Sequence, residues 1–402
     1  MKVLLVNKFL YPNGGSETYI FRVGEELAKM GHHIEYFGME HEGRIVGNHV
    51  ESYTSNMDFH GGKIKKLLYP FKIIYSVEAR KKLRAVLEDM QPDVVHLNNF
   101  NFQLTPSILY EIRSFEKKAK RPVKIIYTAH DSQLVCPNHL MQQYLTGEPC
   151  TKCIGADSSN CTKYRCIHGS RIKSLLGTIE NKLYRALKTY SLIDTIICPS
   201  FFLQDKLNRD PILREKTMVL HNFVDKIDIS NDLQDRAGER YVVYFGRFSR
   251  EKGIATLLKV IKRLPQIPFL FIGNGPLEKE VNEVENIRNI GFQTGADLYK
   301  RIAEAQFSLF PSECFENCPF SVMESILYST PVICANIGGT PELLKNEKNG
   351  ELFESGNEKQ LYEKIKKLWE DKELLDSYTD NCKEHNFATA EEYCKKLIEI
   401  YR

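Results

Sequence analysis

Two glutamates, Glu316 and Glu324, bracket the predicted start of a helix eight positions apart. The apolar run 307–310 before them is typical of a buried strand, and Val322 and Ile326 lie at helical spacing. A helix start presents unpaired N–H groups that suit a phosphate. Carboxylates accept hydrogen bonds, so they suit the hydroxyls of a sugar or ribose. The alternative is a pair of exposed glutamates stabilised by the helix dipole.

Cations and glycines follow two other predicted strands. Arg247 and Lys252 come after the strand 241–245, and a Gly-Asn-Gly turn at 273–275 comes after the strand 269–272. Arginine can clamp a diphosphate through two hydrogen bonds, and lysine supplies a point charge. A solvated basic loop is the alternative for this pair alone. Together with the glutamates, these strand ends predict a site for a nucleotide diphosphate joined to a sugar.

The first half of the chain offers a second group of strand ends. A Gly-Gly turn at 14–15 separates the strand 2–7 from a helix, an arrangement that brings backbone N–H groups to a phosphate. His96 and the pair His130-Asp131 stand at the ends of two further strands. A generic turn and structural histidines are the alternative interpretation.

These residues require α/β domains to position them. Strands and helices alternate through both halves, which predicts doubly wound parallel sheets with ligands beyond the carboxyl ends of the strands. A chain of 402 residues is long enough for two domains. Residues 200–225 are predicted to be a hinge, and 226–239 form a polar segment. The predicted strands are 2–7, 34–38, 93–97, 123–130, 193–200, 241–245, 269–272, 307–310 and 331–334.

Composition narrows the class of protein. The chain is 42% hydrophobic and 27% charged with a net charge of +3, which is typical of a globular protein and does not indicate nucleic-acid binding. The apolar run 3–6 is too short for a signal peptide, and no later run approaches the length of a membrane span. We therefore expect a cytoplasmic protein.

Five of the eleven cysteines fall within residues 136–166, in the pattern C-x13-C-x2-C-x7-C-x4-C. In a reducing compartment thiolates at this spacing favour a structural zinc ion over disulfides. Buried thiols without a metal are the alternative. The pattern holds one cysteine more than a tetrahedral site needs. A closed four-thiolate site would leave no open position for chemistry.

Short motifs follow one another along nearly the whole chain. They are Gly14-Gly15-Ser16-Glu17, Thr128-Ala129-His130-Asp131, Gly246-Arg247-Phe248, Glu251-Lys252-Gly253, Gly273-Asn274-Gly275, Pro311-Ser312, Glu316 with Glu324, and Gly338-Gly339-Thr340-Pro341-Glu342. In these motifs the chain resembles the retaining glycosyltransferases of the GT-B fold, in the group 1 or GT4-type family. The resemblance implies an α/β protein of two Rossmann-like doubly wound domains that face a central cleft, with a C-terminal helix crossing back.

The resemblance also implies domain limits. The N-terminal, acceptor-side domain would span 1–205 and carry the cysteine-rich insert 136–166. The domain that binds the nucleotide sugar would span 206–386. The helix 387–402, whose apolar stripe includes Tyr393, would pack back on the first domain.

The implied roles fall on named residues. The catalytic set is His130, Glu316, Arg247 and Lys252, and the donor-binding set is Gly15, Gly246, Arg247, Lys252, Gly273, Asn274, Phe320, Ser321 and Glu324. Arg247 and Lys252 would hold the donor diphosphate, while Glu316 would contact the sugar. Glu324 would contact the ribose. The family often has a Phe-Gly pair where this chain has Cys318-Pro319, so the phosphate donors are predicted to be the N–H groups of Phe320 and Ser321.

Cofactors and partners follow from the same resemblance. The donor would be a UDP- or GDP-sugar, and the acceptor a glycan or a lipid-linked glycan of a bacterial capsule, O-antigen or exopolysaccharide. No Asp-x-Asp pair occurs in the sequence, so no catalytic metal is required. Similar inserts in the family imply zinc ligands at Cys136, Cys150, Cys153 and Cys166, with Cys161 as the substitute.

Two basic segments suggest a surface for peripheral contact with an anionic membrane. Residues 63–84 carry eight Lys or Arg beside interleaved apolar residues, and residues 163–188 carry seven against the single acidic residue Glu180. A basic amphipathic surface of this kind can lie on anionic lipid, which would place the protein at the inner face of the cell membrane. A solvated helix face is the alternative.

Three other functions are alternatives to glycosyl transfer. A GT-B isomerase or hydrolase acting on the sugar nucleotide would share the donor residues. A non-catalytic, zinc-stabilised binding protein would not require Arg247, Lys252, Glu316 and Glu324 together. A Rossmann dehydrogenase would carry Gly-x-Gly-x-x-Gly after the first strand, and the sequence there lacks it.

Overall fold

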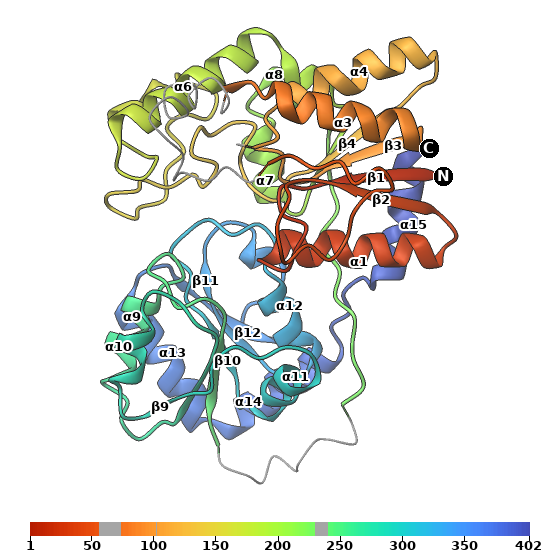
Figure 1. Cartoon of the computed structure of the whole chain (residues 1–402). Helices are drawn as coiled ribbons and strands as arrows, with labels where there is room; N and C mark the ends of the chain where they lie inside the picture. Colours follow the sequence, from red (N-terminus) through yellow and green to blue (C-terminus); the bar gives the residue numbers. More distant parts are fainter. Residues whose placement is uncertain (56–73, 102, 230–239) are drawn as a thin grey trace. The chain divides into compact units, whose positions relative to one another are not determined.

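The computed structural model describes residues 1–55, 74–101, 103–229 and 240–402. These residues form two compact α/β units (Figure 1). The first unit comprises Met1–Thr146, Cys150–His221 and Ala390–Arg402, and the second comprises Gly147–Pro149 and Asn222–Thr389. Each unit contains one six-stranded sheet.

The sheet of the first unit is entirely parallel, with the strand order β2-β1-β3-β4-β5-β6. Its strands are β1 (Lys2–Val6), β2 (His33–Phe37), β3 (Val94–Leu97), β4 (Lys124–Thr128), β5 (Thr195–Cys198) and β6 (Thr217–Val219). Strands in parallel sheets are covered on both faces, so they read as continuous apolar runs. The segment 3–6 of β1 is such a run and is fully buried.

The helices of the first unit are α1 (Gly15–Lys29), α3 (Val77–Met90), α4 (Ser107–Ala119), α5 (Ser159–Lys163), α6 (Arg171–Ala186), η1 (Thr189–Leu192), α7 (Phe201–Leu207), α8 (Pro211–Arg214) and α15 (Ala390–Tyr401). Polar side chains cap several of them. Ser76, Ser170 and Ser200 each accept a hydrogen bond from a backbone N–H in the first turn of the following helix. Among the described residues no helix is both long and apolar enough to cross a membrane.

The segment 200–225, predicted to be a hinge, contains regular structure. It holds α7, α8 and β6, and β6 pairs with β5 through the register Cys198↔Val219. Because this pairing belongs to the first sheet, the first unit continues to His221. Of the predicted polar segment 226–239, residues 230–239 lie outside the described residues.

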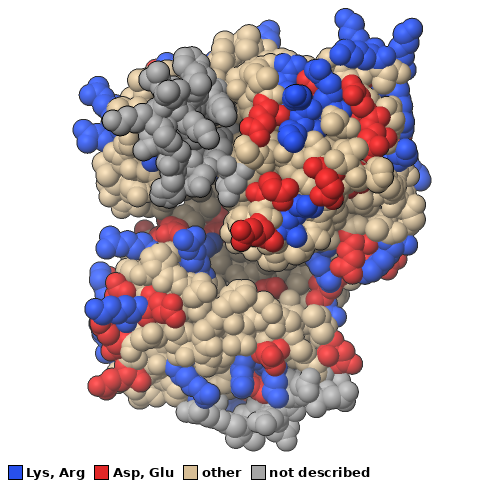
Figure 2. All heavy atoms as spheres, viewed as in Figure 1, with Lys and Arg blue, Asp and Glu red and all other residues tan. Residues whose placement is uncertain are grey.

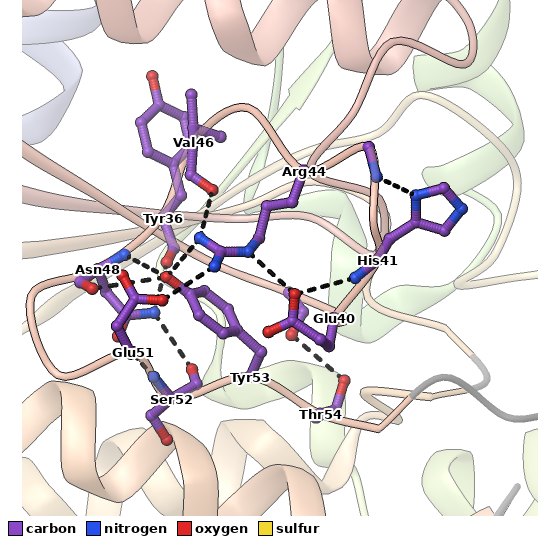
Figure 3. A network of polar contacts seen from close by, with 12 residues as sticks. Tyr36, Glu40, His41, Arg44, Val46, Asn48, Glu51, Ser52, Tyr53 and Thr54 are labelled. Atoms are coloured by element: carbon purple, nitrogen blue, oxygen red, sulfur yellow. Dashed lines mark hydrogen bonds and ion pairs between the residues drawn. The ribbon is translucent and has the colours of Figure 1, made fainter.

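An arginine organises the chain that follows β2 (Figure 3). The guanidinium of Arg44 donates to Glu40 Oε1 at 3.1 Å, to Glu51 Oε2 at 2.9 Å and to the hydroxyl of Tyr53 at 2.9 Å. It also lies 4.0 Å from the centre of the Tyr53 ring. Asn48 adds hydrogen bonds from its Nδ2 to the carbonyls of Tyr36 and Ser52. These contacts fix the described segment that directly follows β2.

The C-terminal helix α15 packs on α1 within the first unit (Figure 1). The hydroxyl of Tyr393 lies 3.0 Å from that of Tyr19 in α1, and the hydroxyl of Tyr401 lies 2.6 Å from Nδ1 of His96 in β3. All four side chains are buried. The helix therefore completes both the apolar core and a buried polar network of this unit.

The second unit has a parallel sheet with the order β12-β11-β10-β7-β8-β9. Its strands are β7 (Val242–Phe245), β8 (Phe269–Ile272), β9 (Ile287–Asn289), β10 (Ser308–Phe310), β11 (Val332–Asn336) and β12 (Gly350–Glu354). Its helices are α9 (Ile254–Ile261), α10 (Glu278–Asn282), α11 (Gly295–Glu304), α12 (Phe320–Leu327), η2 (Thr340–Glu342), α13 (Glu358–Glu370) and α14 (Lys372–Lys383).

A buried carboxylate stands in the edge strand β12. Glu351 is 1% exposed and accepts from Lys364 at 2.7 Å, from Lys367 at 3.2 Å and from the hydroxyl of Tyr378 at 2.9 Å. A buried carboxylate is costly unless it is paired. These partners, which come from α13 and α14, make its burial tolerable and fix both helices against the sheet.

Candidate functional site

The predicted donor residues of the second unit lie in loops that follow neighbouring strands. β10, β7 and β8 lie side by side in the sheet, and all three are parallel. The loops that follow them carry Gly246 and Lys252, then Gly273, then Glu316. Because parallel strands end at the same edge of a sheet, one edge of this unit gathers these loops.

Lys252 and Glu316 are in direct contact. The Nζ of Lys252 lies 2.5 Å from Oε1 of Glu316, and the two side chains are 32% and 14% exposed. Burial lowers the pKa of Lys252, but the Glu316 carboxylate outweighs this effect and the net shift is upward. The lysine is therefore held as a cation at the sheet edge.

Arg247 differs from Lys252 in its surroundings. Its side chain is exposed, and in the described part of the chain it forms no ion pair. Its backbone is fixed, since the hydroxyl of Tyr244 donates to the Arg247 carbonyl at 2.9 Å. The loop after β7 thus carries both a paired cation, Lys252, and a solvated cation, Arg247.

The turns after β7 and β8 are locked together. Gly246 N–H donates to the Ile272 carbonyl at 2.9 Å, and Phe248 N–H donates to the Asn274 carbonyl at 2.8 Å. Gly273 has a φ of +148°, and a Cβ there would lie 2.0 Å from the Gly246 carbonyl oxygen. Only glycine permits this approach. Predicted donor residues Gly246, Gly273 and Asn274 therefore form one compact backbone surface.

The structure reveals supporting residues for Glu316 that were given no role from the sequence. Ser312 Oγ and Cys314 Sγ reach the same carboxylate oxygen as Lys252, at 2.8 and 3.6 Å. Gly339 N–H donates to the Glu316 carbonyl at 2.7 Å. Gly338 has a φ of +63°, and a Cβ on it would lie 2.2 Å from that carbonyl oxygen. The Pro-Ser and Gly-Gly motifs were visible in the sequence, but only the fold shows that both hold Glu316.

The first turn of α12 has open backbone donors. Pro319 is the N-cap residue, and no side chain caps the helix. The backbone just before the N-cap is fixed at Cys318, whose carbonyl accepts a hydrogen bond from Asn222 Nδ2 at 2.9 Å. Phe320 and Ser321 are the first two helical residues, and their N–H groups have no partner within the helix by geometry.

Glu324 lies one turn further along α12 than these donors. Burial raises its pKa from the ordinary value of 4.5 to about 7, an effect that a hydrogen bond from the Tyr299 hydroxyl at 3.4 Å partly opposes. A carboxyl group with this pKa titrates near neutrality. The two glutamates therefore sit in different environments, one against a lysine and one against a tyrosine.

In the first unit, Gly15 is the first residue of α1 and is exposed. The loop before it is fixed through the buried carboxylate of Glu17, which accepts from Asn7 Nδ2 at 2.8 Å and from Ser16 Oγ at 2.9 Å. Asn99 Nδ2 in turn donates to Ser16 Oγ at 2.8 Å. The ends of β1 and β3 thus hold the glycine turn in place.

His130 follows β4 and is kept neutral. Burial lowers its pKa to about 3. Its Nε2 lies 2.9 Å from Asn98 Oδ1, while Asn98 Nδ2 faces the carbonyls of Val6 and His96 at 3.4 Å each, so the Asn98 oxygen accepts from His130. The Tyr19 ring stands edge-on to His130 with 4.8 Å between centres. Burial also raises the pKa of Asp131 to about 6.

His96 is part of the core. It is fully buried, and burial lowers its pKa to about 3. Both of its ring nitrogens are engaged, Nδ1 with the Tyr401 hydroxyl and Nε2 with Thr128 Oγ1 at 2.7 Å. The structural interpretation of this histidine therefore holds.

The five cysteines of the insert line one small cavity. Cys136, Cys150, Cys153, Cys161 and Cys166 surround it together with Asn138, Gln142 and Ile154. All five are free thiols, and burial raises the pKa of Cys136 to about 12 and that of Cys153 to about 11. Within the described ranges, no group of three or more His, Cys, Asp or Glu has the arrangement of a metal site.

Two family models match the chain. Residues 13–226 match the model described as Glycosyltransferase Family 4, and residues 225–385 match the model described as Glycosyl transferases group 1. The first match alone covers more than half of the chain. The two matches meet at residues 225–226, close to the boundary between the structural units at His221 and Asn222.

Known relatives have similar descriptions. An uncharacterized glycosyltransferase of Methanocaldococcus jannaschii is 27% identical over 234 residues, covering 57% of this chain and 64% of that protein. The N-acetylgalactosamine-N,N'-diacetylbacillosaminyl-diphospho-undecaprenol 4-alpha-N-acetylgalactosaminyltransferase of Campylobacter jejuni is 28% identical over 192 residues, covering 45% and 52%. The matches therefore span less than two thirds of either relative.

A solved structure agrees over the full length. HepE of Anabaena, in a crystal with UDP and glucose, has a TM-score of 0.66 and 17% identity, and the match covers 100% of this chain and 99% of that one. This likeness shows the fold, two Rossmann-like units of the GT-B type. The chain belongs to the group 1, family 4 glycosyltransferases of the GT-B fold.

Proposed function

We propose that this protein transfers a hexose from a nucleoside diphosphate donor to a glycan or lipid-linked acceptor, with retention of configuration at the sugar. The observation that carries this proposal is the edge of the second sheet. There Lys252, Arg247 and the open start of α12 supply positive charge and N–H donors, and Glu316 stands within reach of the lysine. The crystal of HepE with UDP and glucose supports a nucleotide-sugar donor.

The chemistry follows from where charge develops. When the bond between sugar and diphosphate breaks, negative charge accumulates on the departing phosphate. Cations and N–H groups already fixed in place stabilise that charge without reorganising. These cations and N–H groups would come from Arg247, Lys252, Phe320 and Ser321. The turns at Gly246, Gly273 and Asn274 would let the protein backbone approach the donor closely.

The carboxylates would bind the neutral parts of the donor. Glu316 is held by Lys252 and Ser312 through one oxygen, so its position is fixed for a hydrogen bond from a sugar hydroxyl. Glu324 would accept from the ribose hydroxyls, as carboxylates do. We assign no covalent nucleophile.

The first unit would hold the acceptor. Neutral His130 and the N–H groups around Gly15 would face the reacting sugar and phosphate. The lipid-linked acceptor named for the Campylobacter relative supports an undecaprenol-type or similar glycan carrier. The process served would be synthesis of a bacterial surface polysaccharide, at the inner face of the cell membrane.

Two substitutions test the donor site. Lys252→Ala and Glu316→Gln should each lower transfer from the productive UDP- or GDP-sugar at least about a hundredfold. Lys259→Ala is the matched control, because Lys259 pairs with Glu358 at 2.7 Å on the exposed face of the same unit. Circular dichroism and thermal unfolding would show whether each variant folds.

Product analysis separates transfer from its alternatives. Mass spectrometry with and without acceptor should show a glycosylated acceptor and free nucleoside diphosphate. Release of free sugar or an isomerised nucleotide sugar regardless of acceptor would contradict transfer. Full activity of either Lys252→Ala or Glu316→Gln would contradict the residue assignment.

We also propose that the cysteine cavity binds a structural zinc ion through Cys136, Cys150, Cys153 and Cys166. The support is that all five cysteines line one cavity and that thiolates suit zinc. Purified protein should contain roughly one zinc ion per chain by elemental analysis. Cys153→Ser should lose it and Cys161→Ser should retain it; a metal-free wild type with unchanged stability would contradict the proposal.

A further inference from the structure

Helix α6 buries a largely polar face and exposes an apolar face. The residues it buries are Ser174, Gly177, Thr178, Asn181 and Tyr184, which are mostly small or polar. Its exposed apolar residues are Ile172 at 74%, Leu175 at 47%, Ile179 at 43% and Leu183 at 38%. These four recur at intervals of three or four, so they form one stripe along the helix. An ordinary surface helix presents the opposite faces to core and solvent.

Specific contacts fix this orientation. Ser174 Oγ accepts from the N–H of Ile167 at 3.0 Å, and Thr178 Oγ1 donates to the Ser158 carbonyl at 3.2 Å. Gly177 lies against Ile167, so closely that an added Cβ would be 2.5 Å from its Cδ1. The polar face of α6 is thus hydrogen-bonded to the cysteine-rich insert and the residue that follows it. The helix cannot rotate to bury its apolar stripe without breaking these bonds.

The apolar surface continues beyond the start of the helix. Tyr144 is 55% and Leu145 is 64% exposed. Leu145 lies beside Gly169, where an added Cβ would be 3.2 Å from Leu145 Cδ2, and the Tyr144 ring is 5.9 Å from that of His168. Because Gly169 and Ser170 lead into α6, these exposed apolar side chains lie near the N-terminal end of the helix.

Basic side chains border the stripe. Residues 171–188 contain five Lys or Arg and one acidic residue, Glu180. Arg171 and Lys173, which flank Ile172, form no ion pair with any described residue. Burial raises the pKa of Glu180 to about 8, so it carries little negative charge at neutral pH. Figure 2 shows Lys and Arg side chains projecting from the margin of the first unit near α6.

We propose that α6 is an interfacial membrane helix, which inserts its apolar stripe among the acyl chains of an anionic lipid surface and sets Arg171 and Lys173 against the headgroups. An apolar face bordered by cations is the chemistry that such surfaces recognise. Charge complementarity favours lipid over a second copy of this chain, since two such basic borders would repel each other.

This inference extends the proposed function, because a lipid-linked acceptor is presented at a membrane surface. It does not depend on catalysis, since binding to lipid can be measured without a donor or an acceptor. A protein that binds vesicles but transfers no sugar would refute the proposed function alone. A protein that transfers sugar to a water-soluble acceptor but ignores vesicles would refute this inference alone.

The test is sedimentation of the full chain with vesicles. Wild type should bind vesicles of phosphatidylglycerol and phosphatidylethanolamine at low salt, bind less as salt rises, and bind vesicles of phosphatidylcholine poorly. The triple variant Ile172→Gln/Ile179→Gln/Leu183→Gln should lower the partition coefficient at least about tenfold. All three side chains are exposed, so folding should be preserved, which circular dichroism would verify.

Two further variants sharpen the result. Ile45→Gln is the matched control, because Ile45 is 59% exposed elsewhere in the first unit, and it should bind like wild type. Arg171→Ala/Lys173→Ala should weaken binding to anionic vesicles and reduce its salt dependence. No binding by wild type at low salt, equal binding by the triple variant, or a wild-type dimer that the triple variant dissolves would each overturn the proposal.

Discussion

Glu324 offers a test in which stability and binding respond to one proton. The perturbation is Glu324→Gln, which keeps the shape of the side chain and removes its ionisation. Burial raises the pKa of Glu324 from 4.5 to about 7. Between these pH values the native protein holds a proton that the unfolded chain has lost. The free energy of unfolding therefore falls as pH rises through this window, and the full cost is present above pH 7.

The size of the effect follows from the shift. A difference of about 2.5 pKa units corresponds to on the order of 3 kcal/mol. At pH 5 only about 1 kcal/mol of this cost is present, and at pH 8 nearly all of it is. Glutamine cannot ionise, so Glu324→Gln should gain stability relative to wild type by about 2 kcal/mol between pH 5 and pH 8. Other titrating groups are common to both proteins and cancel in this difference.

Binding should change in the opposite direction. If the ionised carboxylate accepts from the ribose hydroxyls, wild type should bind UDP or GDP more tightly as pH rises from 6 to 8. The glutamine variant should lose both affinity and this pH dependence. Urea unfolding measures the first effect and titration calorimetry the second.

An exposed carboxylate in the same unit supplies the control. Glu283 is exposed, so Glu283→Gln should leave nucleotide affinity unchanged. The reasoning is refuted if the stability difference between Glu324→Gln and wild type is the same at pH 5 and pH 8. It is also refuted if Glu324→Gln binds nucleotide as wild type does at pH 8.

Three other substitutions have defined outcomes. Gly338→Ala places a Cβ 2.2 Å from the Glu316 carbonyl oxygen, so it should lower both kcat/KM for the donor and the unfolding temperature. Normal kinetics in this variant would contradict the role of that contact. Tyr401→Phe leaves a nitrogen of buried His96 unpaired and should cost about 1–3 kcal/mol in urea unfolding, so an unchanged midpoint would argue against the bond. Asn98→Ala removes the hydrogen bond that holds His130 and should lower kcat. Calorimetry should show unchanged nucleotide affinity, because the proposed nucleotide contacts apart from Gly15 belong to the other unit; a lost affinity would contradict this division.

The central strands of both sheets were predictable from the sequence. Strands such as 3–6 and 269–272 are buried on both faces, so they read as apolar runs. Three strands were not predicted: β6, β9 and β12. All three lie at sheet edges, where the chain is partly exposed and polar residues are tolerated. β12 even contains Glu351, whose burial depends on two lysines of the following helix, α13.

The proposed site was predicted in part. The motifs located Lys252 and Glu316, because glycines and charges after strands are visible in one dimension. Their mutual contact was not visible, since 64 residues separate them. The roles of Ser312 and Gly338 were also missed, because both depend on how the folded backbone turns near Glu316.

Two predictions concerned basic segments that could contact a membrane. The basic segment 63–84 lies outside the described residues as far as residue 73. The other basic segment contains α6, where periodicity alone could not tell which face is buried. That choice depends on hydrogen bonds from Ser174 and Thr178 to the insert, which follow only from the packed structure.

The position of α15 has a consequence for synthesis of the protein. The hydroxyls of Tyr393 and Tyr401 complete hydrogen bonds that begin at Tyr19 and His96, more than three hundred residues earlier. A ribosome releases the whole second unit before it releases these two tyrosines. During synthesis, α1 of the first unit therefore stays uncovered by α15 until the second unit has been made, and apolar surface exposed in this interval favours aggregation.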